Sequence, residues 1–508
     1  MRKIFTSLLF SMTMIMATFS NTYAFEESAI EKAYNNVVSY YQKVKSLESP
    51  DEIIAVEALG LEAEEGYELP DLESQDFESL SLGDLSKSII ALTLIQKDPT
   101  SIQGIDLVAL LESNVHDDGS IQGSYGSSTD IWVLFALESV SSNKTDIVAK
   151  HLSEDNNTDG GFWYEYNGKW SSPDTTGWGI EALTIAGKTQ YAESINKALN
   201  YIQTQQMGNG VYGYSANADT QSCVLEGLFA YDKDLVLNGT YDQDGVNPIE
   251  VLLSFQLEDG SFKSEVYDEN WNATGEYTFN AYTTLESARC LGTYKNGSFV
   301  EKAKKEFSLL KQALSVSQVK EGESIELQLE TTTISKEILE AAKGKDIDLV
   351  VKEKDYTWVI NGKNITSTKD IDLGVQFDTH AIDENRVKNV AKDNESKQIS
   401  LNYDGDFGFK ATLQFNVGEK NANKSATLYY NDNDLKEIYH TKVDNQGNVS
   451  LEFTHASDYL LVLSEDQTNE KAPNKDVVQT SDESQIMMYV SLLLLSAIVY
   501  MKGRKDFE

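Results

Sequence analysis

Residues 159–163 read Asp-Gly-Gly-Phe-Trp, and a short polar loop leads from them to residues 174–183, Asp-Thr-Thr-Gly-Trp-Gly-Ile-Glu-Ala-Leu. The same unit, an Asp-Gly or Asn-Gly turn followed by an aromatic or aliphatic residue and then an apolar helix, occurs four times. The glycines of the four turns, Gly119, Gly160, Gly210 and Gly260, lie 41, 50 and 50 residues apart. A period of this length indicates stacked helical hairpins, because one hairpin cannot bury its apolar face alone.

Two weaker helical units precede these four, at residues 54–59 and 85–92. The helices between the turns carry apolar residues at helical spacing, for example Ile195, Leu199 and Ile202. After a signal segment, residues 25–314 are therefore predicted to form about six helical hairpins.

The turn has a longer form, Gln-x-x-x-Gly-x-aromatic, which is complete at residues 206–212 and 256–262. This form resembles the repeat of the terpenoid cyclase and protein prenyltransferase superfamily. The resemblance covers about residues 30–314 and implies an all-α (α/α) toroid, in which inner helices form a ring inside outer ones and a ligand cavity lies at the mouth. The toroid is also similar to that of the cobalamin carriers, in which a β-domain follows the helices.

The chemistry of these families can be compared with this chain. Class II cyclases use an Asp-x-Asp-Asp run, and none occurs here. No histidine lies between Leu152 and Thr379 to complete a prenyltransferase zinc site. Cys223 is followed three residues later by Glu226, whereas a thioester requires glutamine. The sequence therefore favours a protein without these three activities.

Aromatic residues are frequent in the loops between repeats and at helix starts, where the mouth of a toroid would lie. Such rings can stack on a ligand. Phe162, Tyr212 and Phe262, the turn aromatics, are instead interpreted as packing residues. The candidate ligand-binding residues are Tyr125, Trp170, Trp178, Tyr214 and Trp271.

Asp174 and Asp219 immediately precede apolar helices, and two interpretations stay open. An aspartate at that place commonly caps the helix, because its carboxylate accepts from backbone N–H groups of the first turn. The alternative is that both are general acids of a toroid enzyme.

Residues 155–160, Asp-Asn-Asn-Thr-Asp-Gly, match the first half of an EF-hand loop. Asp155, Asn157 and Asp159 are the candidate calcium ligands, although Tyr166 stands where the bidentate glutamate is usual. The repeat turn explains the same residues without a metal. Calcium is the one cofactor that the sequence suggests.

Both ends of the chain predict its destination. Arg2 and Lys3 precede an apolar stretch, which predicts a secretory signal over residues 1–24. The apolar run 486–501 is followed by a basic tail, 502–508, which predicts a transmembrane anchor with the tail in the cytoplasm.

Before that run, residues 477–482 (Val-Val-Gln-Thr-Ser-Asp) resemble the sorting signal that sortase recognises in Gram-positive bacteria. The resemblance implies cleavage between Thr480 and Ser481 and linkage to the cell wall. Anchoring in the membrane alone is the alternative. Either way, the protein is expected at the cell surface.

Composition agrees with an exported protein. The chain has 42 Lys and Arg against 81 Asp and Glu, and its net charge of −39 makes nucleic acid an unsuitable partner. The two cysteines, Cys223 and Cys290, lie on apolar helices and are expected to be buried thiols.

The pattern becomes strand-like after residue 314. Residues 325–330 alternate with period two, and the apolar run 356–360 meets Asn361-Gly362, a strong hairpin signal. A β-rich, sandwich-like domain is predicted over residues 315–465, followed by a polar linker over residues 466–485.

Three functions compete. The preferred one is a surface-displayed protein whose toroid binds a small molecule or glycan. The second is a toroid enzyme, either cyclase-like or glycan-cleaving, that uses Asp174 and Asp219. The third is adhesion to a host surface component.

Overall fold

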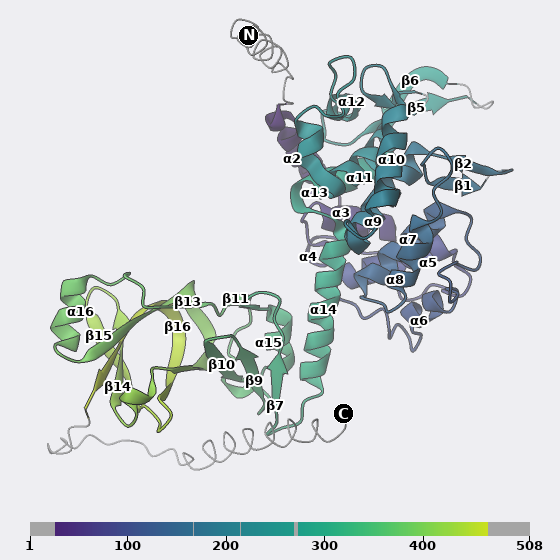
Figure 1. Cartoon of the computed structure of the whole chain (residues 1–508). Helices are drawn as coiled ribbons and strands as arrows, with labels where there is room; N and C mark the ends of the chain where they lie inside the picture. Colours follow the sequence, from purple (N-terminus) through teal and green to yellow (C-terminus); the bar gives the residue numbers. More distant parts are fainter. Residues whose placement is uncertain (1–25, 166, 214, 269–272, 466–508) are drawn as a thin grey trace, which may run out of the picture. The chain divides into compact units, whose positions relative to one another are not determined.

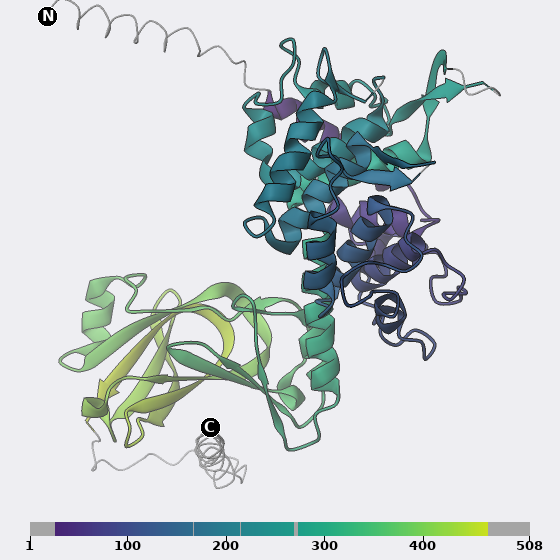
Figure 2. The same ribbon diagram turned by 45° about the vertical axis from the view of Figure 1, so that its right-hand side comes forward.

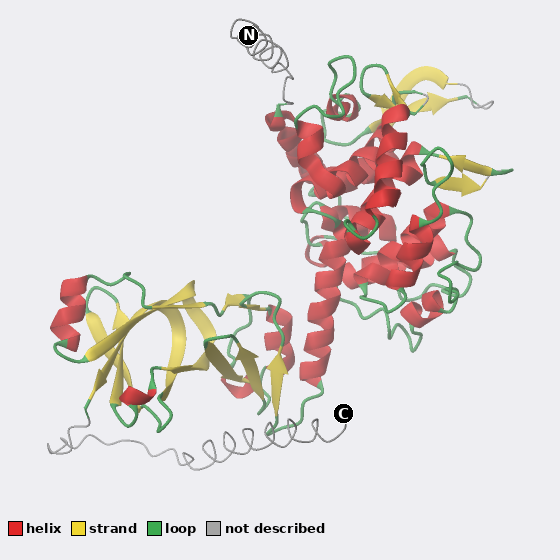
Figure 3. Ribbon diagram, in the orientation of Figure 1, coloured by secondary structure: helices red, strands yellow, loops and turns green. Residues whose placement is uncertain are grey.

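The computed structural model describes residues 26–165, 167–213, 215–268 and 273–465. They divide into two compact units. The first contains the described residues up to Val375 together with residues 401–413 and 452–457, and the second contains residues 376–400, 414–451 and those from Asp458 onward. Helices dominate the first part of the chain and strands the later part (Figure 3).

The helical region is built of inner and outer helices that alternate along the chain. The inner helices are α3 (Pro50–Ala58), α5 (Leu82–Leu94), α7 (Ser127–Ser139), α9 (Pro173–Gly187), α11 (Ala218–Leu237) and α13 (Ala281–Asn296). The outer helices are α2 (Glu27–Tyr41), α6 (Leu107–Glu112), α8 (Thr145–Ser153), α10 (Ala192–Thr204) and α12 (Pro248–Leu253). The short α4 (Ala63–Gly66) follows α3, and the long α14 (Phe299–Ser317) follows α13 (Figure 1).

Each inner helix contacts the next, and α13 contacts α3, so the inner helices close a ring. Equivalent positions of neighbouring helices meet. Trp132 and Trp178, each the sixth residue of its helix, lie with ring centroids 5.8 Å apart. Glu226 and Arg289, each the ninth residue, form an ion pair. Helices that match residue for residue in this way run parallel, so all of them begin at the same end of the ring.

The repeat motif has a clear physical basis in the contacts of its residues. Gln256 donates from Nε2 to the carbonyl oxygen of Ala33 on α2, 2.9 Å away. The glycine of the motif, Gly260, has φ of 96°, and a Cβ there would lie 2.1 Å from the carbonyl oxygen of Asn36. Only glycine tolerates both constraints. The aromatic residue, Phe262, is fully buried, and its N–H donates to Thr284 at the start of α13.

These contacts also close the outer ring, because the last repeat packs on the first helix. The earlier turns make the same contact with their neighbours: a Cβ on Gly160 would lie 2.5 Å from the carbonyl oxygen of Lys197 on α10. At the inner ring, Asn296 of α13 donates to the carbonyl oxygen of Ala58 of α3 at 2.8 Å. The helical hairpins predicted from the repeat are thus confirmed, and Phe162, Tyr212 and Phe262 are buried as predicted.

Short antiparallel hairpins lead into three of the inner helices. They are β1 (Trp163–Glu165) with β2 (Lys169–Ser171), β3 (Gln206–Met207) with β4 (Val211–Tyr212), and β5 (Lys263–Tyr267) with β6 (Ala273–Phe279). In both ribbon views the β1–β2 and β5–β6 hairpins project from the same side of the helices (Figures 1 and 2).

The strand-rich part of the first unit surrounds Trp358. This residue is fully buried, donates from Nε1 to the carbonyl oxygen of Leu373 at 2.7 Å, and packs edge-on against Phe407 and Phe453. Helix α15 packs against α14. The elements here are β7 (Ser324–Leu327), β8 (Thr333–Ile334), α15 (Lys336–Ala342), β9 (Asp348–Lys352), β10 (Tyr356–Asn361), η1 (Gly362–Asn364), β11 (Ile371–Asp372) and the middle of β13 (Glu395–Asn416).

The second unit has a smaller core, formed by Ile382, Ala391, Leu460 and Val462. In it β14 pairs antiparallel with both β15 and the end of β16. Its elements are α16 (Glu384–Ala391), η2 (Glu419–Asn421), β14 (Ser425–Asn431), β15 (Leu435–Lys442) and the ends of β13 and β16 (Asn448–Ser464), while β12 (Val375–Phe377) begins at the last residue of the first unit.

Two details of the strand region differ from the sequence prediction. Asn361-Gly362 does not turn a hairpin; β10 pairs with the preceding strand β9, and Gly362 begins a 3₁₀ turn. Glycine is needed there for close packing, since a Cβ would lie 2.2 Å from the carbonyl oxygen of Ala342. The sheet is also mixed, because β7 and β9 are parallel, whereas a sandwich of the predicted kind is antiparallel.

The predicted signal segment, linker, sorting signal with Thr480 and Ser481, and anchor over 486–501 lie outside the described residues, as do Tyr214 and Trp271. None of the helices in the described part of the chain combines the length and the apolar character needed to cross a membrane.

Candidate functional site

The candidate site lies at the end of the ring where the inner helices begin. We call this end the N-terminal face and define it as the loops that lead into α7, α9, α11 and α13 together with the first two turns of these helices. Ser172 caps α9 and Asn217 caps α11, each accepting a backbone N–H three residues on. The capping interpretation of Asp174 and Asp219 is therefore wrong. Each occupies the second helical position, which leaves its carboxyl for other contacts.

Asp174, Asp219 and Glu286 come from three consecutive inner helices, and we call them the carboxyl cluster. Burial raises the pKa of Asp174, and the charge of Asp219 raises it further, although the Thr220 hydroxyl lowers it. Burial raises the pKa of Glu286 to about 8; Arg289 lowers it in part, while Asp219 and Asp174 raise it. These three carboxyls therefore share one electrostatic environment, in which each opposes the ionisation of the next.

Several buried polar atoms of the N-terminal face have no hydrogen-bond partner among the described residues. Four of them lie on α9, α11 and α13: Asp174 Oδ1, Asp219 Oδ1, Trp178 Nε1 and Thr283 Oγ1; Asp130 Oδ1, in the first two turns of α7, is a further one. Thr283 is buried, and although its hydroxyl lies beside Asp219 and lowers the pKa of that carboxyl, its Oγ1 makes no contact of hydrogen-bond geometry. Leaving a buried polar group without a partner costs about 1–3 kcal/mol. Four such atoms on neighbouring helices are typical of a place that a ligand or ordered water completes.

Directly below the carboxyl cluster, the ninth positions of the same helices form the floor, Glu181, Glu226 and Arg289. Arg289 is 2% exposed and bonds Glu226 in a bidentate manner, Nε to Oε1 at 2.7 Å and Nη2 to Oε2 at 3.0 Å. Its guanidinium also lies 5.4 Å from the ring centroid of Trp132 and 5.6 Å from that of Trp178. Burial and the charge of Glu226 raise the pKa of Glu181 well above its usual range, and Ser298 donates to it at 2.7 Å.

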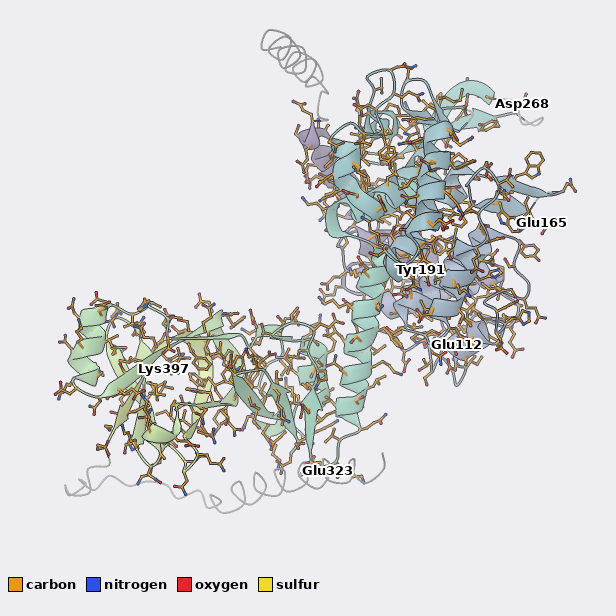
Figure 4. The ribbon with its side chains drawn as sticks, viewed as in Figure 1. Glu112, Glu165, Tyr191, Asp268, Glu323 and Lys397 are labelled. Atoms are coloured by element: carbon orange, nitrogen blue, oxygen red, sulfur yellow. The ribbon has the colours of Figure 1, made fainter. Side chains whose placement is uncertain are left out.

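Exposed aromatic rings occur in the loops and hairpins that lead into these helices and at the start of α13, and we call them the aromatic rim. Of the residues predicted to bind a ligand, Tyr125 is 74% exposed and Trp170 59% exposed, whereas Trp178 is partly buried. Trp170 lies opposite Tyr164 in the β1–β2 ribbon. Figure 4 shows the outer ends of the hairpins, marked by Glu165 and Asp268, pointing away from the helices. The rim consists of Tyr125, Tyr164, Trp170, Tyr267, Tyr277, Phe279 and Tyr282.

The candidate calcium ligands contact protein groups. Asp155 accepts hydrogen bonds from the indole of Trp163 at 2.7 Å and from Lys169 at 3.0 Å. Asp159 accepts from the hydroxyl of Ser171 at 2.7 Å, and Asn157 donates to the same hydroxyl. Among the described residues, no group of three or more His, Cys, Asp or Glu side chains is arranged to hold a metal. Calcium binding stays a prediction.

Asn157 and Asp159 also line a polar cleft of about 800 Å³ between the 153–160 segment and α10. Its side chains are largely bonded to one another. Ser194 donates to Asn156 at 2.6 Å, and Asn156 in turn donates to the carbonyl oxygen of Gly160 at 2.9 Å. The cleft therefore lacks the unsatisfied polar atoms that distinguish the N-terminal face.

The sequence interpretation missed Glu286 and Arg289 as members of the site. Glu181 and Glu226 stand at the ninth position of their helices, and Arg289 stands at the same position of α13. The sequence signal for Arg289 was an arginine at the position where the other two helices carry glutamate. This equivalence can be recognised only when the first residue of each helix is known. Cys223 and Cys290 are free and buried as predicted, and burial raises the pKa of both thiols.

No protein-family model and no curated protein matches this chain. Among solved structures, a type II terpene cyclase from Scytonema in complex with merosterolic acid A is similar over 55% of this chain and 98% of its own, with 13% identity and a TM-score of 0.38. A polysaccharide lyase is similar over 55% of this chain and 97% of its own, with 10% identity and a TM-score of 0.35. Likeness at this level carries no argument about activity.

Proposed function

We propose that the N-terminal face of the ring binds a carbohydrate. The observation that carries the proposal is a group of buried, unsatisfied polar atoms on neighbouring helices, together with exposed aromatic rings on the loops that lead into these helices. Sugars present hydroxyl groups that both donate and accept hydrogen bonds, and their ring faces carry C–H groups that pack on aromatic side chains. The carboxyl oxygens of Asp174 and Asp219 accept from hydroxyls, and the indole N–H of Trp178 donates to one.

The chemistry of the face argues against other ligand classes. A purely apolar ligand would leave the four polar atoms without partners, at a cost that removes much of its binding free energy. A polyanion would meet the carboxyl cluster and a chain of net charge −39. A hydroxyl-rich ligand satisfies the polar atoms and avoids the repulsion.

A glycan array probed with the labelled full-length protein tests the proposal. We expect selective binding that weakens about five- to tenfold in a Tyr125→Ala, Trp170→Ala variant, because the change removes stacking area while leaving the packed core intact. Ile438→Ala is the matched control, since Ile438 is 48% exposed but belongs to β15. Absence of binding to every glycan on the array would contradict the proposal.

A second candidate function is cleavage of a glycosidic bond, which the raised pKa of Glu286 favours. A carboxyl that stays protonated near neutral pH can give its proton to the leaving oxygen, while an ionised Asp219 takes a proton from the attacking water. Release of reducing ends from a bound glycan, lost in Glu286→Gln while binding persists, would support this function. Binding without any release of reducing ends would reject it.

We also propose that the protein is exported and held at the cell surface, with the toroid displayed outward. This proposal rests on the sequence of the two ends of the chain. Digestion of the cell wall followed by fractionation tests it. Release of the protein with the wall supports sortase-dependent linkage at Thr480, retention in the membrane supports anchoring by the apolar run 486–501, and recovery from the cytoplasm contradicts both.

A further inference from the structure

We propose that the ligand of the N-terminal face is a glycan that carries free amino groups, an amino sugar with its nitrogen unacetylated, and that its ammonium group lies between Asp174 and Asp219. This inference rests on the proposed carbohydrate site. It names the class of sugar, and it follows from the kinds of polar atom that lack partners and from the charges around them.

The unsatisfied atoms require a ligand that both donates and accepts hydrogen bonds. Asp174 Oδ1 and Asp219 Oδ1 are acceptors, so they need donors. Trp178 Nε1 is only a donor, so it needs an acceptor. An ammonium group supplies three donors and no acceptor, whereas a neighbouring hydroxyl supplies the acceptor. A sugar with an amino group beside a hydroxyl contains both within one ring.

The charges of the N-terminal face leave room for a cation. The Arg289 guanidinium is held by both carboxylate oxygens of Glu226. Lys87 of α5, whose Nζ lies 4.8 Å from the ring centroid of Trp132, is paired with Asp51 at 2.8 Å. Arg289 and Lys87 are thus matched by other carboxylates. Asp174, Asp219 and Glu286 have no cation of their own among the described residues.

The groups that face Glu286 come from each of the helices packed around it. Tyr282 and Arg289 belong to its own helix, Asp219 and Cys223 to α11, and Asp174 to α9. Arg289 is the one cation in this set, and it lowers the pKa of Glu286 only in part. A bound ammonium would favour the charged form of all three carboxyls, so these groups should lose protons on binding, to an amine that is neutral in solution or to the solvent.

Aromatic rings add a preference for the same ligand. Tyr282, the second residue of α13, is 51% exposed, and Trp178 presents a partly buried ring at the sixth position of α9. A cation over such a ring gains an electrostatic attraction that a neutral acetamide does not. An acetylated sugar would place an uncharged group between two carboxyls and satisfy neither as well.

Isothermal titration calorimetry on the full-length protein tests the inference with three probes: glucosamine tetramer, its fully N-acetylated counterpart, and a galacturonate tetramer. We expect the free amine to bind at least about tenfold more tightly than the acetylated sugar at pH 7. We also expect its binding enthalpy to vary with the ionisation enthalpy of the buffer, which reports the net exchange of protons on binding. The galacturonate should bind least.

A variant pair sharpens the test. Asp174→Asn with Asp219→Asn should abolish the preference for the free amine and the proton release, while Glu193→Gln, an exposed carboxyl on α10, should change neither. Equal or tighter binding of the acetylated sugar would overturn the inference and leave the carbohydrate site standing. Failure of all three probes and of the glycan array would remove the site itself.

Discussion

Two layers of the same ring treat buried polar groups differently. In the floor, the ion pair between Glu226 and Arg289 is bidentate, and Ser298 bonds one carboxyl oxygen of Glu181, whose other oxygen, Oε2, has no partner among the described residues. Closer to the helix starts, at the N-terminal face, Asp174, Asp219 and Trp178 each keep a buried polar atom without a partner. The same helices position both layers, so the difference lies in the side chains. The floor uses polar groups to hold the ring together, and the face leaves them available for binding.

The first prediction breaks the floor and has the largest effect. Arg289→Met should lower the free energy of unfolding by about 3–5 kcal/mol, because it leaves the carboxylate of Glu226 buried and uncompensated. Chemical denaturation of the full-length protein measures it. Lys197→Met, which removes an exposed pair with Glu193, is the control and should stay close to the parent. If the free energy of unfolding fell as much in the control as in Arg289→Met, the floor would have no special role in stability.

The second prediction concerns pH and the face. The pKa of Glu286 is raised to about 8 in the folded protein, from 4.5 in the ordinary state. Between these values the folded state keeps a proton that the unfolded state has lost, so stability is greatest at low pH and falls as pH rises towards 8. The contribution of this group should be about 2–4 kcal/mol.

Glu286→Gln isolates that contribution, because glutamine keeps the shape of the side chain and does not titrate. Unfolding free energies of parent and variant, measured from pH 5 to pH 8, should converge at the acid end and separate at the basic end, where the variant is more stable. A parent curve that runs parallel to that of the variant over the whole range would contradict the raised pKa.

The third prediction has the smallest effect on stability and contrasts most directly with the first. Asp174→Asn with Asp219→Asn should raise the unfolding free energy by about 1 kcal/mol at pH 8, because it removes the repulsion between two carboxyls whose pKa values are raised by burial. Groups that serve binding and not folding behave in this way. A loss of several kcal/mol would place these aspartates in the framework of the ring instead.

The repeat made the ring predictable because its turn is constrained by contacts that recur. Neighbouring hairpins are joined by contacts of Gln256, Gly260 and Phe262. Because each of these residues makes its own contact, their spacing recurs in the sequence. The strand region was harder to predict from the sequence. Asn361-Gly362 has the composition of a hairpin turn, but glycine is needed there because the backbone of Ala342 lies too close for a Cβ.

The site was predictable in part. Asp174, Asp219 and Trp178 were identified from their place at helix starts, and the structure brings them to the same face. Glu286 and Arg289 escaped notice because they stand in α13, whose sequence departs from the Glu-Ala-Leu pattern of the other repeats. The capping interpretation failed because Ser172 and Asn217, two residues before each aspartate, take that role. An offset of two residues decides between a cap and a ligand group, and composition alone does not resolve it.

The central claim is that the polar atoms without partners at the N-terminal face are ligand contacts. The indole N–H of Trp178 reports on it directly, by ¹H–¹⁵N correlation spectroscopy of the indole-labelled full-length protein during titration with glucosamine tetramer. The indole of Trp358 is the internal control, because it lies outside the ring and already donates to a protein oxygen. We predict a saturable shift of the Trp178 signal with the Trp358 signal unmoved. Saturation of binding by calorimetry with no change at Trp178 would contradict the account.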